Sequence, residues 1–171
     1  ISVDGHTSTN DTVLLLANGQ SNSASLTGEE LVSFQHALDE TCADLAQSIV
    51  ADGEGAKHRI TIDVCQCRQR DEALQIAKTV ANSSLVKTAV TGADPNWGRI
   101  VSAAGYAGVA FDPNQLDVSI NGIVIFRGGA PMIFDHGALS SSMRDNFETK
   151  IVHLRLELNF HFISSTEKLK L

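Results

Sequence analysis

The stretch from Leu116 to Phe126, LDVSINGIVIF, decides the fold class. Two apolar runs rich in β-branched residues flank the dipeptide Asn121-Gly122. Asn-Gly suits the two left-handed positions of a type I′ turn, so the stretch predicts a β-hairpin. The chain therefore contains antiparallel pairing, and its remaining elements must be compatible with that pairing.

Helical patterns precede the hairpin. Residues 27–30, TGEE, fit a capping box, and a long helix should follow and end near residues 52–55, DGEG. A second helix is expected at 71–82, a short buried helix at 13–17 after the cap-forming residues 7–12, and a small-residue helix at 101–105. The apolar positions of the long helix recur at spacings of three and four: Leu31, Phe34, Leu38, Cys42, Leu45 and Ile49.

Strand patterns alternate with these helices. Residues 59–64, RITIDV, alternate polar and apolar side chains and predict a strand with one buried face. Further strands are expected at 85–90 and 151–158, the latter followed by an extended piece at 160–163. Helices mixed with antiparallel strands favour a single α+β domain, in which helices pack on a mixed or antiparallel sheet.

Composition excludes several functional classes. The 171 residues carry a net charge of -7 without a run of Lys or Arg, which argues against nucleic acid or anionic lipid as a partner. No apolar run reaches the ~18 residues of a membrane span, so we expect a soluble protein. The phosphate-binding glycine motifs are absent, as is a Gly-x-Ser-x-Gly elbow. Small metabolites are the expected ligands.

The three cysteines predict buried, reduced thiols. Cys65 and Cys67 should share one face of a strand, and Cys42 completes an odd set. A structural zinc site needs about four ligands. Only His36 and His58 are candidates to add to the cysteines, and their spacing is not typical of a zinc site. We therefore expect no metal. The six histidines are scattered and predict surface or satisfied side chains.

Glu54 lies between two glycines, in DGEG, and has two interpretations. The segment can be a tight helix exit with a solvated carboxylate. Alternatively, the bare neighbours let a ligand approach, and a carboxylate can bind an ammonium group through charge-assisted hydrogen bonds. The residues alone leave both open.

Residues 92–100, GADPNWGRI, concentrate special side chains and suit the start of a helix. Asp94 can cap free amides, Pro95 fits the first turn, and Trp97 can pack against the sheet. Arg99 can pair with Asp94 or point at a ligand carboxylate. The second alternative makes the chain a small-anion-binding domain.

Four blocks together resemble the ornithine acetyltransferase family, whose members are often bifunctional with N-acetylglutamate synthase activity. They are VDGHTSTNDT at 3–12, DGEGA at 52–56, SLVKTA at 84–89 and GADPNWGRI at 92–100. The resemblance covers residues 1–158, as a β-chain-like domain. Residues 159–171 form a divergent tail.

This resemblance implies a precursor that cleaves itself before a threonine, leaving α and β chains in an α2β2 assembly. The freed threonine carries acetyl from N-acetylornithine to glutamate in arginine biosynthesis, without metal or cofactor. Some members also use acetyl-CoA as the donor. The nucleophile is expected upstream of Ile1, so no catalytic residue is assigned here. Glu54 is implied as a substrate-binding residue; pocket or scaffold roles are assigned to Asn10, Asp11, Asp94, Asn96 and Arg99.

The chain departs from the family at two places. His6 stands where members commonly have Asp, and the family's substrate-holding carboxyl end is not matched after Leu158. A non-catalytic remnant that only binds a partner chain is therefore the rival hypothesis. The resemblance implies a cytoplasmic location in bacteria and a chloroplast or mitochondrial one in eukaryotes.

Overall fold

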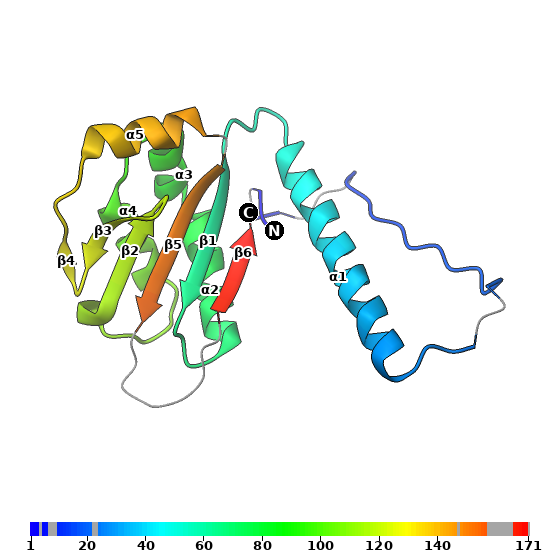
Figure 1. Ribbon diagram of the computed structural model, residues 1–171. Coiled ribbons are helices and arrows are strands. Elements are labelled where there is room, and N and C mark those ends of the chain that lie inside the picture. Colours follow the sequence, from blue (N-terminus) through cyan, green and yellow to red (C-terminus); the bar gives the residue numbers. More distant parts are fainter. Residues whose placement is uncertain (4, 7–9, 22–23, 147, 157–165, 171) are drawn as a thin grey trace.

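A mixed sheet forms the centre of the computed structural model, which describes residues 1–171 except 4, 7–9, 22–23, 147, 157–165 and 171. Within these residues six strands pair in the order β4-β3-β2-β5-β1-β6. The pair β1 (Arg59–Cys65) and β5 (Glu148–Leu156) is parallel, and every other neighbouring pair is antiparallel. The predicted α+β class is confirmed (Figure 1).

The predicted hairpin lies within this sheet. It consists of β2 (Leu116–Ile120) and β3 (Ile123–Arg127), and Asn121 and Gly122 have φ of 49° and 83°. These are the left-handed conformations that the turn requires. The short β4 (Ala130–Pro131) extends the sheet beyond β3, and β6 (Thr166–Lys170) pairs with β1 at the other edge.

Three helices cover one face of the sheet: α2 (Arg70–Asn82), α3 (Ser84–Thr91) and α4 (Trp97–Gly105) (Figure 1). The 3-10 turn η1 (Pro113–Gln115) leads into β2, and α5 (His136–Asp145) runs along the end of the sheet. Most side chains between sheet and helices are fully or almost fully buried. The core includes Ile62, Val64, Ile76, Val80, Leu116, Ile120, Ile125, Leu139 and Met143.

The long helix α1 (Gly28–Ala51) forms as predicted but buries none of its residues. It stands apart from the sheet in Figure 1, and 51% of Leu31 and 55% of Phe34 are exposed. The predicted capping box is wrong, because the Thr27 side chain caps nothing. The backbone of Thr27 is extended, as is usual at a helix start, but Gly28 follows it in a left-handed conformation, at φ 54°.

Two other predicted elements are wrong. Residues 85–90 belong to helix α3 rather than to a strand, because Ser83 caps Val86 N–H and Val86, Ala89 and Val90 form a buried helical face. Residues 13–17 form no helix, and 90% of Leu16 is exposed. Helix nucleation is unfavourable, and a helix of five residues gains too few hydrogen bonds to offset it unless another surface packs against it.

Strand β1 is more buried than its alternation predicts. Thr61 and Cys65 on the second face are buried as well as Ile62 and Val64, because β1 lies between β5 and β6. Polar residues on the second face of a strand suggest that this face is exposed. The alternating pattern therefore does not reveal that β1 is an interior strand of the sheet. The expected extended piece at 160–163 lies outside the described residues.

The cysteines are free, as predicted, but differ in setting. Cys42 is exposed on α1, which contradicts its expected burial. Cys67 is buried but follows the end of β1, because the left-handed Gln66, at φ 62°, terminates the strand. Burial, with the Glu72 carboxylate and Cys65 nearby, raises the pKa of the Cys67 thiol to about 11 against the weaker opposite effect of Arg68.

Candidate functional site

The exit of α1 places Glu54 on a tight turn. The Gly53 N–H donates to Val50 O at 3.3 Å, and the Ala56 N–H donates to Gly53 O at 2.9 Å. Gly55 has a φ of 72°, which a side chain would strain. The expected helix exit is therefore present, and it leaves the Glu54 side chain exposed.

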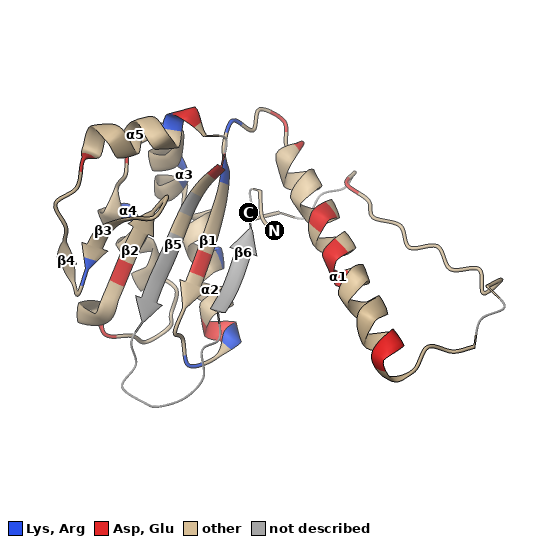
Figure 2. Ribbon diagram, viewed as in Figure 1, with Lys and Arg blue, Asp and Glu red and all other residues tan. Residues whose placement is uncertain are grey.

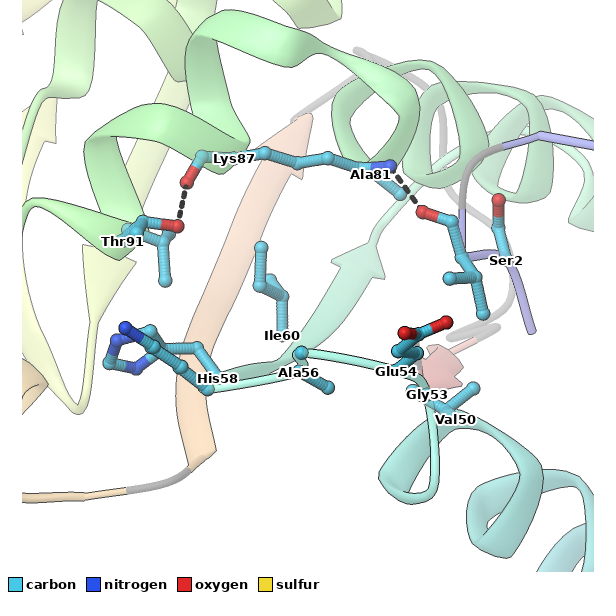
Figure 3. A pocket seen from close by; sticks show the side chains of 14 residues that line it. Ser2, Val50, Gly53, Glu54, Ala56, His58, Ile60, Ala81, Lys87 and Thr91 are labelled. Carbon is cyan, nitrogen blue, oxygen red and sulfur yellow. Dashed lines mark hydrogen bonds between the residues drawn. The ribbon is translucent and has the colours of Figure 1, made fainter.

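A cavity of about 280 Å³ opens beside this turn. Five segments border it: residues 2–3, the end of α1 with its exit turn, the start of β1, the end of α2, and α3. Ile60, Ala81 and Val90 supply apolar lining, and Glu54 projects toward the same space (Figure 3). The turn is thus both a helix exit and the border of a pocket.

Lys87 lies across this cavity from Glu54 (Figure 3). Its side chain is half-buried, and its Nζ donates a hydrogen bond to the Val3 carbonyl. His58 also lines the cavity, and its Nδ1 is buried with no hydrogen-bond partner in the described part of the chain. A cation, an anion and an unused imidazole nitrogen therefore border one small space.

Asp11 belongs to a second hollow, between the amino-terminal segment and the end of α1. Glu54 lines this hollow as well, as do His6, Leu45 and Ile49. Asn10 is exposed, and its carbonyl accepts a hydrogen bond from the Thr12 hydroxyl at 3.1 Å. The structure thus brings Asp11, but not Asn10, to a space that Glu54 also borders.

The GADPNWGRI segment forms the start of α4, as predicted, but with a different cap. The Asn96 side chain, rather than Asp94, caps the helix by accepting from the Arg99 N–H at 3.1 Å. Asp94 accepts from the Asn96 side-chain amide at 3.0 Å and so orients that cap. Pro95 does not lie in the first turn of α4. It precedes the N-cap residue Asn96, and the helix begins at Trp97.

Trp97 packs against the sheet, as predicted, with its ring stacked on Phe126 of β3 at a centroid distance of 5.0 Å. Arg99 contacts α3: its guanidinium donates to Leu85 O at 3.0 Å and to Thr88 Oγ1 at 3.1 Å. These bonds tie α4 to α3. They support a scaffold role for Arg99 and do not place it in the cavity of Glu54.

The predicted site residues therefore separate into two groups. Glu54 and Asp11 border hollows at the end of α1, whereas Asp94 and Asn96 build the start of α4 and Arg99 ties that helix to α3. Arg99 also lines a separate hollow between α2 and α4, and Asn10 lines neither hollow of Glu54. Lys87 was missed as a pocket residue, although it lies in the SLVKTA block. The block was predicted to be a strand, and a strand does not give the helical spacing that turns the Lys87 side chain of α3 toward the cavity.

Two absences concern the described residues alone. Among them, no group of three or more His, Cys, Asp or Glu side chains is placed to hold a metal ion. No described helix combines the length and apolar character of a membrane span.

Comparison with known proteins gives concordant matches. The ArgJ family profile matches residues 1–163. The "Arginine biosynthesis bifunctional protein ArgJ" of Rhodopirellula baltica is 48% identical over 151 residues, which are 86% of this chain and 37% of that protein. The protein of the same name from Desulfotalea psychrophila is 54% identical, over 75% of this chain and 33% of its own.

A plant relative and a solved structure extend the comparison. The protein of Citrullus lanatus named "Arginine biosynthesis bifunctional protein ArgJ, chloroplastic" is 49% identical, over 87% of this chain and 34% of its own. The crystal structure of ArgJ from Bacillus halodurans matches with a TM-score of 0.86 and 36% identity, over 99% of this chain and 78% of that one. The chain thus spans about a third of the length of these curated relatives.

Proposed function

The chain belongs to the ArgJ family, and we propose that it is part of an acetyltransferase that moves acetyl from N-acetylornithine to glutamate. Acetyl-CoA is proposed as a second donor. The ArgJ relatives are named as bifunctional proteins of arginine biosynthesis, which supports a place in that pathway. The proposed reaction needs no metal or cofactor.

One observation carries the role of this chain: the Glu54 carboxylate faces a small cavity with an apolar lining. A carboxylate there can bind the free ammonium group of ornithine or of glutamate by charge-assisted hydrogen bonds. Apolar residues such as Ile60 and Val90 suit the methylene groups of either amino acid. Glu54 is therefore proposed to bind substrate.

The proposed reaction runs through a threonine upstream of Ile1 in the polypeptide. Its hydroxyl attacks the acetyl carbonyl of N-acetylornithine, its own terminal amine takes the hydroxyl proton, and the ornithine amine leaves with a proton. The ammonium group of glutamate first loses a proton to solvent, and the resulting amine attacks the acyl-enzyme ester. Its second proton passes through the terminal amine to the threonine oxygen, which releases N-acetylglutamate and restores the hydroxyl. An oxyanion hole from the α chain would stabilise both tetrahedral intermediates.

An α chain from the same precursor is the proposed partner, in an α2β2 assembly. The exposed apolar residues of this chain support a large partner, because such clustered surface is typical of interfaces. Leu14, Leu15 and Leu16 are 77%, 79% and 90% exposed, and the stripe on α1 adds Leu31, Phe34 and Leu45. Cellular location follows the source: the cytoplasm in a bacterium, a chloroplast or mitochondrion in a eukaryote.

The test is co-expression of this chain with the amino-terminal and carboxyl-terminal portions of the Rhodopirellula baltica ArgJ protein. We expect transfer of labelled acetyl from N-acetylornithine to glutamate. Glu54→Gln should raise the KM for both substrates by roughly tenfold or more, since it removes a charged hydrogen-bond acceptor. The control is Asp71→Asn, at the exposed start of α2, which should leave both KM values unchanged.

Two results would count against the proposal. A folded assembly that transfers no acetyl would favour the non-catalytic, partner-binding alternative. An active assembly with the same KM values after Glu54→Gln would remove Glu54 from the binding site while leaving the family's reaction in place.

A further inference from the structure

The cavity of Glu54 holds a second charge that the proposed function does not use. Lys87 reaches it from α3, and its half-buried side chain faces the space on the side opposite Glu54 (Figure 3). The two residues come from separate segments, and apolar residues including Ile60 line the space. Their charges are therefore displayed on opposite sides of one apolar space.

This arrangement matches the charges of a free amino acid. We propose that Lys87 binds the carboxylate of the amino-acid substrate while Glu54 binds its ammonium group. A short carbon chain separates the δ-ammonium group of N-acetylornithine from its α-carboxylate, and a similar chain separates the α-ammonium group of glutamate from its γ-carboxylate. One pair of side chains can therefore orient either substrate. This inference rests on the proposed function, and makes Lys87 a specificity-determining residue of the same site.

The contacts of Lys87 leave its charge available. Its Nζ donates to the Val3 carbonyl, a neutral acceptor that holds the ammonium group at the cavity without cancelling its charge. An ammonium group has three donors, so others remain for a ligand. Helix α3, which carries Lys87, is held in place by its buried residues Val86, Ala89 and Val90. Within it, the Thr91 hydroxyl donates a hydrogen bond to the Lys87 carbonyl at 2.9 Å.

Lys57 supplies the natural comparison, because it is a second lysine of the same cavity. It is exposed and lies three residues after Glu54, on the same loop. Lys87 instead reaches the cavity from α3, on the side opposite Glu54, where the far end of a ligand bound to Glu54 would lie. Lys57 therefore serves as a lysine of the same cavity that comes from the segment of Glu54 itself.

The experiment is isothermal titration of the co-expressed assembly with N-acetylornithine, glutamate and N-acetylputrescine. N-acetylputrescine keeps the ammonium group of N-acetylornithine but lacks its carboxylate. Lys87→Met should weaken binding of N-acetylornithine and glutamate about tenfold to a hundredfold, and leave that of N-acetylputrescine unchanged. Lys87→Arg should restore most of the loss, and Lys57→Met should change nothing.

The outcomes separate this inference from the proposed function. Equal weakening of all three ligands by Lys87→Met would mean that Lys87 only holds the Val3 segment in place, and would overturn the inference. The same holds if Lys57→Met, rather than Lys87→Met, selectively weakens the carboxylate ligands. If Glu54→Gln weakens binding while Lys87→Met does not, the inference fails and the proposed function stands. Wild-type protein that binds neither substrate would overturn both.

Discussion

Cys67 is the residue whose surroundings most clearly change the acidity of its side chain. Burial raises its pKa from the ordinary 9.0 to about 11, and the Glu72 carboxylate adds to this effect. The folded chain thus holds the Cys67 proton between pH 9 and 11, where the unfolded chain releases it. Stability from this group is complete below pH 9 and is lost as pH rises toward 11.

This predicts a fall in the free energy of unfolding of about 1–2 kcal/mol across that window. Urea denaturation between pH 8.5 and 11 measures it, with Cys67→Ala as the control that should remove this part of the slope. Alkylation gives a second check, because exposed Cys42 should react near pH 9 while Cys67 stays protected. Rapid alkylation of Cys67 at pH 9 would contradict the burial.

Individual residues show where sequence reasoning stops. Glu54 could be singled out because its two glycine neighbours are visible in the sequence, and the cavity beside it fits that choice. Lys87 could not be singled out, since its relevance depends on the packing of α3, a separate element, against the cavity of Glu54. A local sequence pattern describes only the neighbours of a residue along the chain, whereas a pocket brings together segments that are distant in the sequence.

At the scale of elements, the start of α4 tests what the GADPNWGRI segment contributes. Asn96→Ala removes the side chain that accepts from the Arg99 N–H, and should lower the free energy of unfolding by about 1 kcal/mol. Asn96→Ser keeps a capping oxygen and should recover most of it. Thermal unfolding measures both variants. Neither should alter substrate KM, because Asn96 is assigned to the scaffold; a selective KM change would place it in the pocket instead.

The predicted elements succeeded or failed for physical reasons. The hairpin was predictable because Asn121-Gly122 suits only a narrow class of turns. Residues 85–90 misled because β-branched side chains favour a strand, whereas the Ser83 cap and buried Val86 and Val90 stabilise a helix. α1 has strong helical periodicity, but periodicity cannot tell whether a covering surface lies in the same chain.

At the scale of the molecule, α1 and the preceding segment have an unsatisfied surface. The stripe of α1 is exposed at Leu31, Phe34 and Leu45, and residues 13–16 are exposed throughout. The helix also carries five acids, Glu29, Glu30, Asp39, Glu40 and Asp44, and no Lys or Arg (Figure 2). Two such helices would repel each other, so a second copy of this chain fits poorly. A partner with apolar residues flanked by basic ones fits better.

The last prediction follows from that surface. Leu14→Ser with Leu16→Ser should leave the free energy of unfolding of the isolated chain within about 0.5 kcal/mol, since these side chains are mostly exposed. The same double variant should prevent assembly with the co-expressed ArgJ portions, because the partner would lose two apolar anchors. Size-exclusion chromatography measures assembly, and urea denaturation measures stability. The control is Ile133→Ser, an apolar residue in the segment before α5 that is even more exposed, which should assemble normally. Normal assembly of the leucine variant would place the partner elsewhere.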